Sequence, residues 1–170
     1  QDTRRFGVFS KVPVLDPATP EQGFAMMKAA FDLSEKYRTP IIVRPTTRIC
    51  HASTFFEVED ETFAKPIPEE GFGRSSRWVI FPRRAFEGHG EINERLASIA
   101  KDYAQDEPLA SFNPQEQGGD ASFSPRLGVA AGGVSASYVR EALRRLEELC
   151  GEQGVQMPSY RFWQVGTPYP

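Results

Sequence analysis

The stretch VPVLDPATPEQGFAMMKAAFDLSEKYRTPIIV, residues 12–43, has the pattern of a strand, a helix and a second strand. Val12–Leu15 is a short apolar run. Thr19 can cap a helix that starts at Pro20, and Pro40 disfavours helical geometry in the residue before it. Ile41–Val43 is a β-branched run that suits an interior parallel strand. The stretch therefore predicts a βαβ unit with two parallel strands and a right-handed crossover.

Residues 54–73 mix acidic residues with prolines and glycines and show no clear period, so we interpret them as a connector. Beyond them, Arg77–Phe81, Leu127–Ala131 and Tyr160–Val165 have strand-like composition. The short run Ala110–Phe112 is a further strand candidate, whereas the polar, glycine-bearing residues Gln115–Ser124 indicate a loop.

Two helices are expected in this second block. One has an apolar stripe at helical spacing, formed by Ile92, Leu96, Ile99 and Tyr103. The other runs from Ser135 to about Cys150, after a turn at Gly132-Gly133. We expect an α/β architecture with mainly parallel strands, divided into a first domain at 1–53, the connector at 54–73 and a second domain at 74–170.

Composition excludes several classes of protein. The chain has 170 residues, a net charge of -3 and a pI of about 5.5, so no basic face for nucleic acid is implied. Its apolar runs are far too short to span a bilayer, and we expect no signal peptide. Cys50 and Cys150 do not form a Cys-x-x-Cys pair; two reduced thiols in a cytoplasmic protein are favoured over a disulfide.

Two stretches carry a resemblance to a known family. The first runs from Gln1-Asp-Thr-Arg-Arg5 through Ala30-Phe-Asp-Leu-Ser-Glu-Lys-Tyr37 to Arg44-Pro-Thr-Thr-Arg48 and His51. It resembles the end of the pyrimidine-binding domain of indolepyruvate ferredoxin oxidoreductase alpha subunits, a thiamine-diphosphate-dependent 2-oxoacid:ferredoxin oxidoreductase family. The second runs from Gly128 to Leu143 and closes with Gly166-Thr-Pro-Tyr-Pro170. It resembles the next domain of that subunit, which is related to the transketolase C-terminal domain and is Rossmann-like.

The resemblance implies an activity in amino-acid catabolism. Enzymes of this family oxidatively decarboxylate arylpyruvates such as indole-3-pyruvate to an acyl-coenzyme A and pass the electrons to ferredoxin. It implies thiamine diphosphate, magnesium and iron–sulfur clusters as cofactors, and a smaller beta subunit as partner. Another 2-oxoacid:ferredoxin oxidoreductase, with a 2-oxoglutarate or branched-chain substrate, and a non-catalytic subunit-interaction module remain alternatives.

Much of that apparatus has no counterpart in the sequence. There is no Gly-Asp-Gly motif for a diphosphate and magnesium, and two cysteines cannot supply the four thiolates of a cluster. Since the chain begins at Gln1 and stops at Pro170, we expect an internal segment, with the family's catalytic glutamate upstream of it. We expect the isolated segment to be inactive, to hold no cofactor and no metal, and to self-associate as a homo-oligomer through apolar surface that the rest of its domain would cover.

Candidate site residues lie in three places. Arg4 and Arg5 can bind a carboxylate or phosphate, or form a solvated terminus. The second group follows the strand at 41–43 and can contact an anionic substrate or a neighbouring subunit, or simply cap the sheet; it consists of Thr46, Thr47, Arg48 and His51. The third can present amides to a phosphate at a helix N-terminus, or form a tight turn; it consists of Gly132, Gly133 and Ser135.

Four aromatic residues could line a pocket for an indole ring, but core positions are the more common place for such side chains. They are Trp78, Phe81, Phe162 and Trp163, and we expect them in the core.

Overall fold

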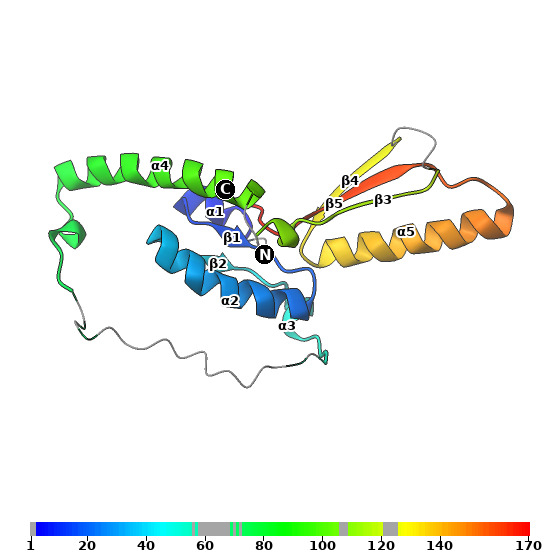
Figure 1. Ribbon diagram of the computed structural model, residues 1–170, viewed down its shortest axis with the longest axis horizontal. Coiled ribbons are helices and arrows are strands. Elements are labelled where there is room, and N and C mark those ends of the chain that lie inside the picture. Colours follow the sequence, from blue (N-terminus) through cyan, green and yellow to red (C-terminus); the bar gives the residue numbers. More distant parts are fainter. Residues whose placement is uncertain are drawn as a thin grey trace.

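The computed structural model describes residues 3–55, 57, 69, 71, 73–105, 109–120 and 126–170. Its elements form two small sheets, each covered by helices, and the molecule is elongated (Figure 1). The expected α/β class is confirmed. Most of the expected connector at 54–73 lies outside the described residues, so the domain boundaries remain a prediction.

The βαβ unit with two parallel strands is present as predicted. Strand β1 (Val14–Leu15) pairs in parallel with β2 (Ile42–Val43), and α2 (Pro20–Tyr37) connects them. The Thr19 hydroxyl accepts a hydrogen bond from the backbone N–H of Gln22 at 3.2 Å, which caps the start of α2.

The last residues of the chain return to the first sheet. The Val14 N–H donates to the carbonyl of Tyr169 at 2.9 Å, and the Asp16 N–H donates to the carbonyl of Gly166 at 2.8 Å. Strand β1 therefore lies between β2 and the C-terminal residues. The short helix α1 (Phe6–Ser10) precedes β1.

The second sheet contains β3 (Gln115–Gly118), β4 (Leu127–Gly132) and β5 (Tyr160–Val165) in the order β3-β5-β4. Strand β5 is parallel to β4 but antiparallel to β3. The expectation of mainly parallel strands thus holds for two of the three pairings among the described strands. Helix α5 (Val134–Gln153) packs on this sheet, and Gly154 ends it in the left-handed conformation.

Three local predictions were wrong. Gln115–Gly118 is a strand and not a loop, because its polar residues occupy a sheet edge and pair with β5. Ala110–Phe112 is the 3-10 helix η2. Residues Arg77–Phe81 form no strand: the 3-10 helix η1 (Ser76–Trp78) begins the segment, where the Ser75 hydroxyl accepts from the Arg77 N–H at 3.2 Å.

Helix α4 (Pro82–Gln105) includes the predicted stripe and begins ten residues before it. Only its C-terminal half packs on the first sheet, where Ile99 and Tyr103 are buried. Polar contacts support the same half: Lys36 forms a 3.1 Å ion pair with Asp102, and the Tyr37 hydroxyl donates to that carboxylate. This core therefore combines residues from both sides of the expected connector: Leu15, Met26, Ala30, Leu33, Ile99, Tyr103, Leu109 and Phe112.

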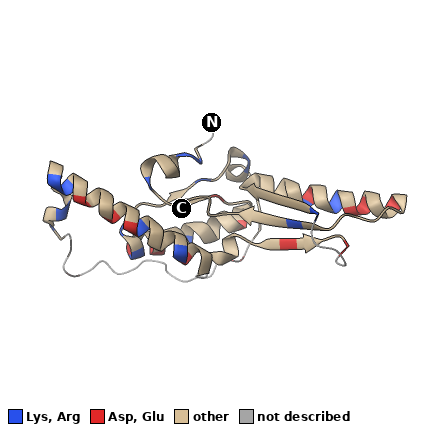
Figure 2. Ribbon diagram, turned by 90° about the horizontal axis from the view of Figure 1, so that it is seen from above, with Lys and Arg blue, Asp and Glu red and all other residues tan. Residues whose placement is uncertain are grey.

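A second core lies between α5 and the second sheet and consists of Ala18, Ala136, Leu143, Met157 and Phe162. On the outer face of α5, charges of both signs follow one another (Figure 2). Hydrogen bonds from Arg144 and, to a smaller extent, from Arg145 lower the pKa of Glu141 to about 2. This face is the solvated side of the helix.

Of the four aromatic residues that we expected in the core, one is buried and three are exposed. Phe162 is fully buried, as predicted, whereas Trp78, Phe81 and Trp163 are 68%, 67% and 50% exposed. The core prediction was wrong for these three, because an apolar run does not show whether its side chains pack inside the chain or stay on its surface.

The Tyr103 hydroxyl is buried without a hydrogen-bond partner among the described residues, and burial raises its pKa. Removing an unsatisfied buried hydroxyl is neutral or stabilising, so we expect Tyr103→Phe to leave the free energy of unfolding unchanged or raise it by up to about 1 kcal/mol. Tyr37→Phe, which loses the bond to Asp102, should lower it by about 1 kcal/mol. Urea unfolding of both variants tests this, and a clear loss of stability in Tyr103→Phe would show that its hydroxyl is hydrogen-bonded.

Candidate functional site: the carboxyl edge of the first sheet

Parallel strands end at the same edge of a sheet, so the residues that follow β1 and β2 meet there. Asp16 follows β1 and Arg44 follows β2. The Nη1 of Arg44 donates to both Asp16 carboxylate oxygens, at 3.1 Å each, and its Nε donates to the Thr3 hydroxyl at 3.3 Å. This contact ties the N-terminal segment to the ends of both strands.

The pair is buried. The Asp16 side chain is 0% exposed and that of Arg44 is 14% exposed. Desolvated charges are tolerated only when paired, so each partner depends on the other. We interpret this pair as the structural anchor of the site.

The Asp16 carboxylate also lies against the turn before α5. A Cβ at Gly133 would be 2.7 Å from the carboxylate Oδ1, and one at Gly132 would be 2.9 Å from the carbonyl oxygen of Val165. Gly133 has φ +54, which favours glycine. Asp16 and Val165 occupy the space that a side chain at these glycines would need, which favours the tight-turn interpretation of Gly132 and Gly133. Ser135 lies exposed in the first turn of α5.

The loop after β2 forms α3 (Thr47–Cys50). Thr46 caps it, with its hydroxyl accepting from the Ile49 N–H at 3.5 Å. The Arg48 guanidinium lies 5.6 Å from the centre of the Tyr138 ring, so α3 also contacts α5 through a cation–π interaction. The predicted loop residues therefore lie where the two sheets join.

Three of the predicted residues line one shallow, open hollow of about 570 Å³: Thr47, Arg48 and His51, with Ala52. A hydroxyl, a guanidinium and an imidazole can together donate hydrogen bonds to an anionic group. Because the hollow is open, it fits an anion carried by a larger molecule or by another protein surface better than a fully enclosed small ligand.

Arg4 and Arg5 lie in the turn before α1, both exposed. The neighbouring Thr3 contacts Arg44, so the N-terminal arginines lie at the same edge as the loop residues. The structure thus brings all three predicted groups to one end of the first sheet, since the Gly132-Gly133 turn also lies there, against Asp16.

Sequence reasoning missed Asp16 and Tyr138 and did not single out Arg44 from its loop. A signal for the ion pair was present, since an acid and a base directly follow two strands predicted to be parallel. For Tyr138 there was none, because its contact with Arg48 joins residues far apart in the chain.

Within the described ranges no group of three His, Cys, Asp or Glu side chains could hold a metal ion. Both cysteines are free, Cys50 exposed and Cys150 partly buried. No described helix is long and apolar enough to cross a membrane.

These features define an α/β protein with polar residues gathered where parallel strands end, the usual position of ligand contacts in open α/β sheets. Comparison with known proteins then gives the family. No family model matches the chain, and no solved structure matches it significantly.

Curated proteins named indolepyruvate oxidoreductase subunit IorA match over 86–100% of the chain. The protein from Thermococcus kodakarensis is 33% identical over 180 residues, covering 100% of this chain and 24% of the relative. That from Methanothermobacter thermautotrophicus is 31% identical over 172 residues, covering 100% of this chain and 25% of the relative. That from Archaeoglobus fulgidus is 32% identical over 153 residues, covering 86% of this chain and 22% of the relative.

The chain is therefore homologous to the IorA subunits of indolepyruvate oxidoreductases, and the resemblance recognised in its sequence is confirmed. It spans about a quarter of the length of the curated relatives it matches.

Proposed function

We propose that this chain is part of the alpha subunit of an oxidoreductase that decarboxylates indole-3-pyruvate and related arylpyruvates to acyl-coenzyme A, with ferredoxin as the electron acceptor. The observation that carries this proposal is the match to IorA subunits along the full length of the chain. A beta subunit is the expected partner, and a cytoplasmic location agrees with two free cysteines.

We expect the cofactor sites of such an enzyme to lie outside this chain. Two cysteines cannot hold a four-thiolate cluster, and Asp16 lies against the glycine turn before α5. In the proposal, thiamine diphosphate, magnesium and the clusters are held by other parts of the enzyme. This chain contributes the carboxyl edge of the first sheet as a contact surface for an anionic substrate group or a neighbouring subunit.

The proposal is tested on the intact alpha subunit assembled with its beta subunit. We expect coenzyme A-dependent reduction of ferredoxin with indole-3-pyruvate, at a higher kcat/KM than with 2-oxoglutarate or branched-chain 2-oxoacids. The reverse order would favour the other 2-oxoacid oxidoreductases. An assembled complex without activity on any of these substrates would favour a non-catalytic interaction module.

The loop after β2 gives a prediction for single variants. Arg48→Ala or Thr47→Ala in the intact enzyme should lower kcat/KM about tenfold, because each removes a donor from the hollow. Arg144→Ala is the matched control, since it removes an arginine from the solvated face of α5. Steady-state kinetics decides: rates equal to the control in both loop variants would leave the loop with a structural role alone.

A further inference from the structure

The segment that leads into α4, together with the start of that helix, carries a dense group of exposed apolar side chains. Trp78, Val79, Ile80, Phe81 and Phe86 are 68%, 55%, 67%, 67% and 83% exposed, and we call them the aromatic patch. Scattered exposed apolar residues are normal, but five large ones within nine residues form a surface of the kind that binds partners. The N-terminal half of α4 extends beyond the first sheet, so the patch lies at one end of the molecule (Figure 1).

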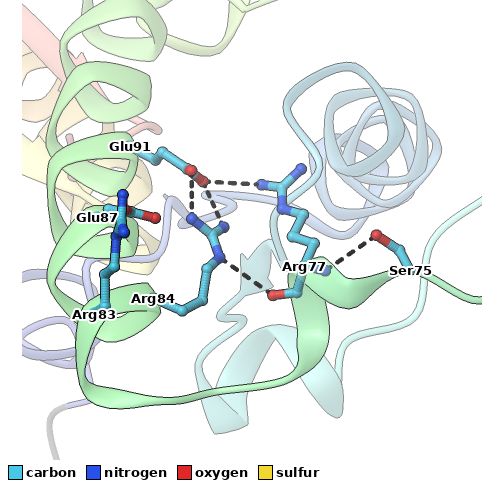
Figure 3. A network of polar contacts seen from close by, with 6 residues as sticks. All are labelled: Ser75, Arg77, Arg83, Arg84, Glu87 and Glu91. Atoms are coloured by element: carbon cyan, nitrogen blue, oxygen red, sulfur yellow. Dashed lines mark hydrogen bonds and ion pairs between the residues drawn. The ribbon is translucent and has the colours of Figure 1, made fainter.

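A polar network holds the patch in shape (Figure 3). The Arg84 guanidinium donates to the Glu91 carboxylate at 2.6 and 2.9 Å and to the carbonyl of Arg77 at 3.3 Å. The Arg77 side chain reaches the same carboxylate at 3.6 Å, and Arg84 lowers the pKa of Glu91. These contacts fix η1 and the following residues against the first turns of α4. A preorganised surface loses less entropy on binding than a mobile one.

The helix beneath the patch contains two glycines whose small size nothing in the described chain requires. A Cβ at Gly88 or at Gly90 would meet no atom within 4 Å. A glycine inside a helix costs about 1 kcal/mol relative to alanine. A partner surface that packs closely against the backbone of α4 would explain both glycines, because a side chain at either position would keep that surface away.

Charge indicates the nature of that surface. Residues 74–91 carry four arginines, at 74, 77, 83 and 84, against two glutamates, whereas the whole chain has a net charge of -3. Arg77 lies 5.4 Å from the Trp78 ring and 3.6 Å from the Glu91 carboxylate, and Arg83, with a side chain 92% exposed, is paired with Glu87 at 2.9 Å. With four arginines against two glutamates, the segment keeps a net positive charge beside the aromatic side chains. An apolar centre with arginines around it matches a partner that has an apolar recess and an acidic rim.

We propose that the aromatic patch is the docking surface for a second subunit of the oxidoreductase, one that presents an apolar recess rimmed by carboxylates. The identity of that partner as an oxidoreductase subunit rests on the proposed function. The apolar groove between α2 and β2, where Phe31 is also 67% exposed, has no Asp, Glu, Lys or Arg among its lining residues to identify an occupant.

The test uses calorimetric titration of this chain, and of the intact alpha subunit, with separately purified beta subunit. Trp78→Ala and Phe81→Ala should each weaken binding at least about tenfold, as expected for aromatic residues at the centre of an interface. Phe31→Ala is the matched control, with an equally exposed aromatic ring, and should bind within about twofold of the unmodified chain. Arg83→Glu should weaken binding severalfold at low salt and less at high salt.

Because these side chains are exposed, the variants should fold, which matching circular dichroism and melting temperatures would establish. Unchanged affinity of both aromatic variants overturns the proposal. Three results with the intact alpha subunit alone would also overturn it: self-association in light scattering that depends on the patch, binding to anionic lipid vesicles that depends on the patch, or complete hydrogen-exchange protection of residues 78–86. Normal indolepyruvate turnover by an assembled Trp78→Ala enzyme would reject the docking surface and keep the proposed function. Patch-dependent binding of the beta subunit by an enzyme that does not turn over indolepyruvate would keep the docking surface and reject the proposed function.

Discussion

Replacing Asp16 with asparagine should lower the free energy of unfolding by about 3–5 kcal/mol, because it leaves the Arg44 guanidinium buried without a counter-charge. Asparagine keeps the shape of the side chain, so the effect reports the charge and not a cavity. Denaturant unfolding measures it. Glu94→Gln, an equally conservative change on an exposed position of α4, is the control and should change stability by no more than about 0.5 kcal/mol.

The same pair allows a stricter check. Arg44→Met alone should also be strongly destabilising, since it leaves the Asp16 carboxylate buried and unpaired. Asp16→Leu combined with Arg44→Met removes both charges and should be less destabilised than the sum of its single changes. Additive losses in this double-mutant cycle would show that the two side chains act independently and would contradict their role as an anchor.

The βαβ unit could be predicted because its signals are local. Thr19 and Pro20 define the start of a helix, Pro40 restricts its end, and two short apolar runs flank it. Short β-branched runs between such boundaries favour parallel strands. Nothing outside residues 12–43 was needed to derive this part of the fold.

The second block was harder because its pairings are not local. Gln115–Gly118 is polar and becomes a strand only because β5, more than forty residues later, pairs with it. Trp78 and Phe81 have the composition of a core strand, yet they lie on the surface. Hydrophobicity measures the gain from leaving water, and it does not tell whether the side chain leaves water inside its own chain or against a partner.

The candidate site was predictable to the extent that it follows the strands. Thr46, Thr47, Arg48 and His51 lie where the end of β2 places them, as topology requires. Asp16 was not singled out from the sequence, although its place after β1 put it beside Arg44. The contact of Asp16 with the glycine turn depends on how α5 packs against the first sheet, which no local pattern encodes.

Phe162→Ala should produce a loss of stability of the same order as the Asp16 change. Phe162 is fully buried on the inner face of β5, in the core beneath α5, and the Arg140 guanidinium lies 5.4 Å from its ring centre. Truncating a buried phenylalanine removes its burial energy and leaves a cavity, which costs about 3–5 kcal/mol. Thermal or urea unfolding should show this loss as a lower midpoint.

Trp163→Ala is the control for this prediction, because Trp163 is the next residue of the same strand and points to the other face. It is half-exposed, so its removal should cost no more than about 1.5 kcal/mol although tryptophan is the larger side chain. The two variants together test the register of β5: neighbouring residues of a strand face opposite sides, and a slip by one residue would exchange them. A larger loss for Trp163→Ala than for Phe162→Ala would mean that the tryptophan face of β5 is the buried one and that α5 packs on the opposite side of the second sheet.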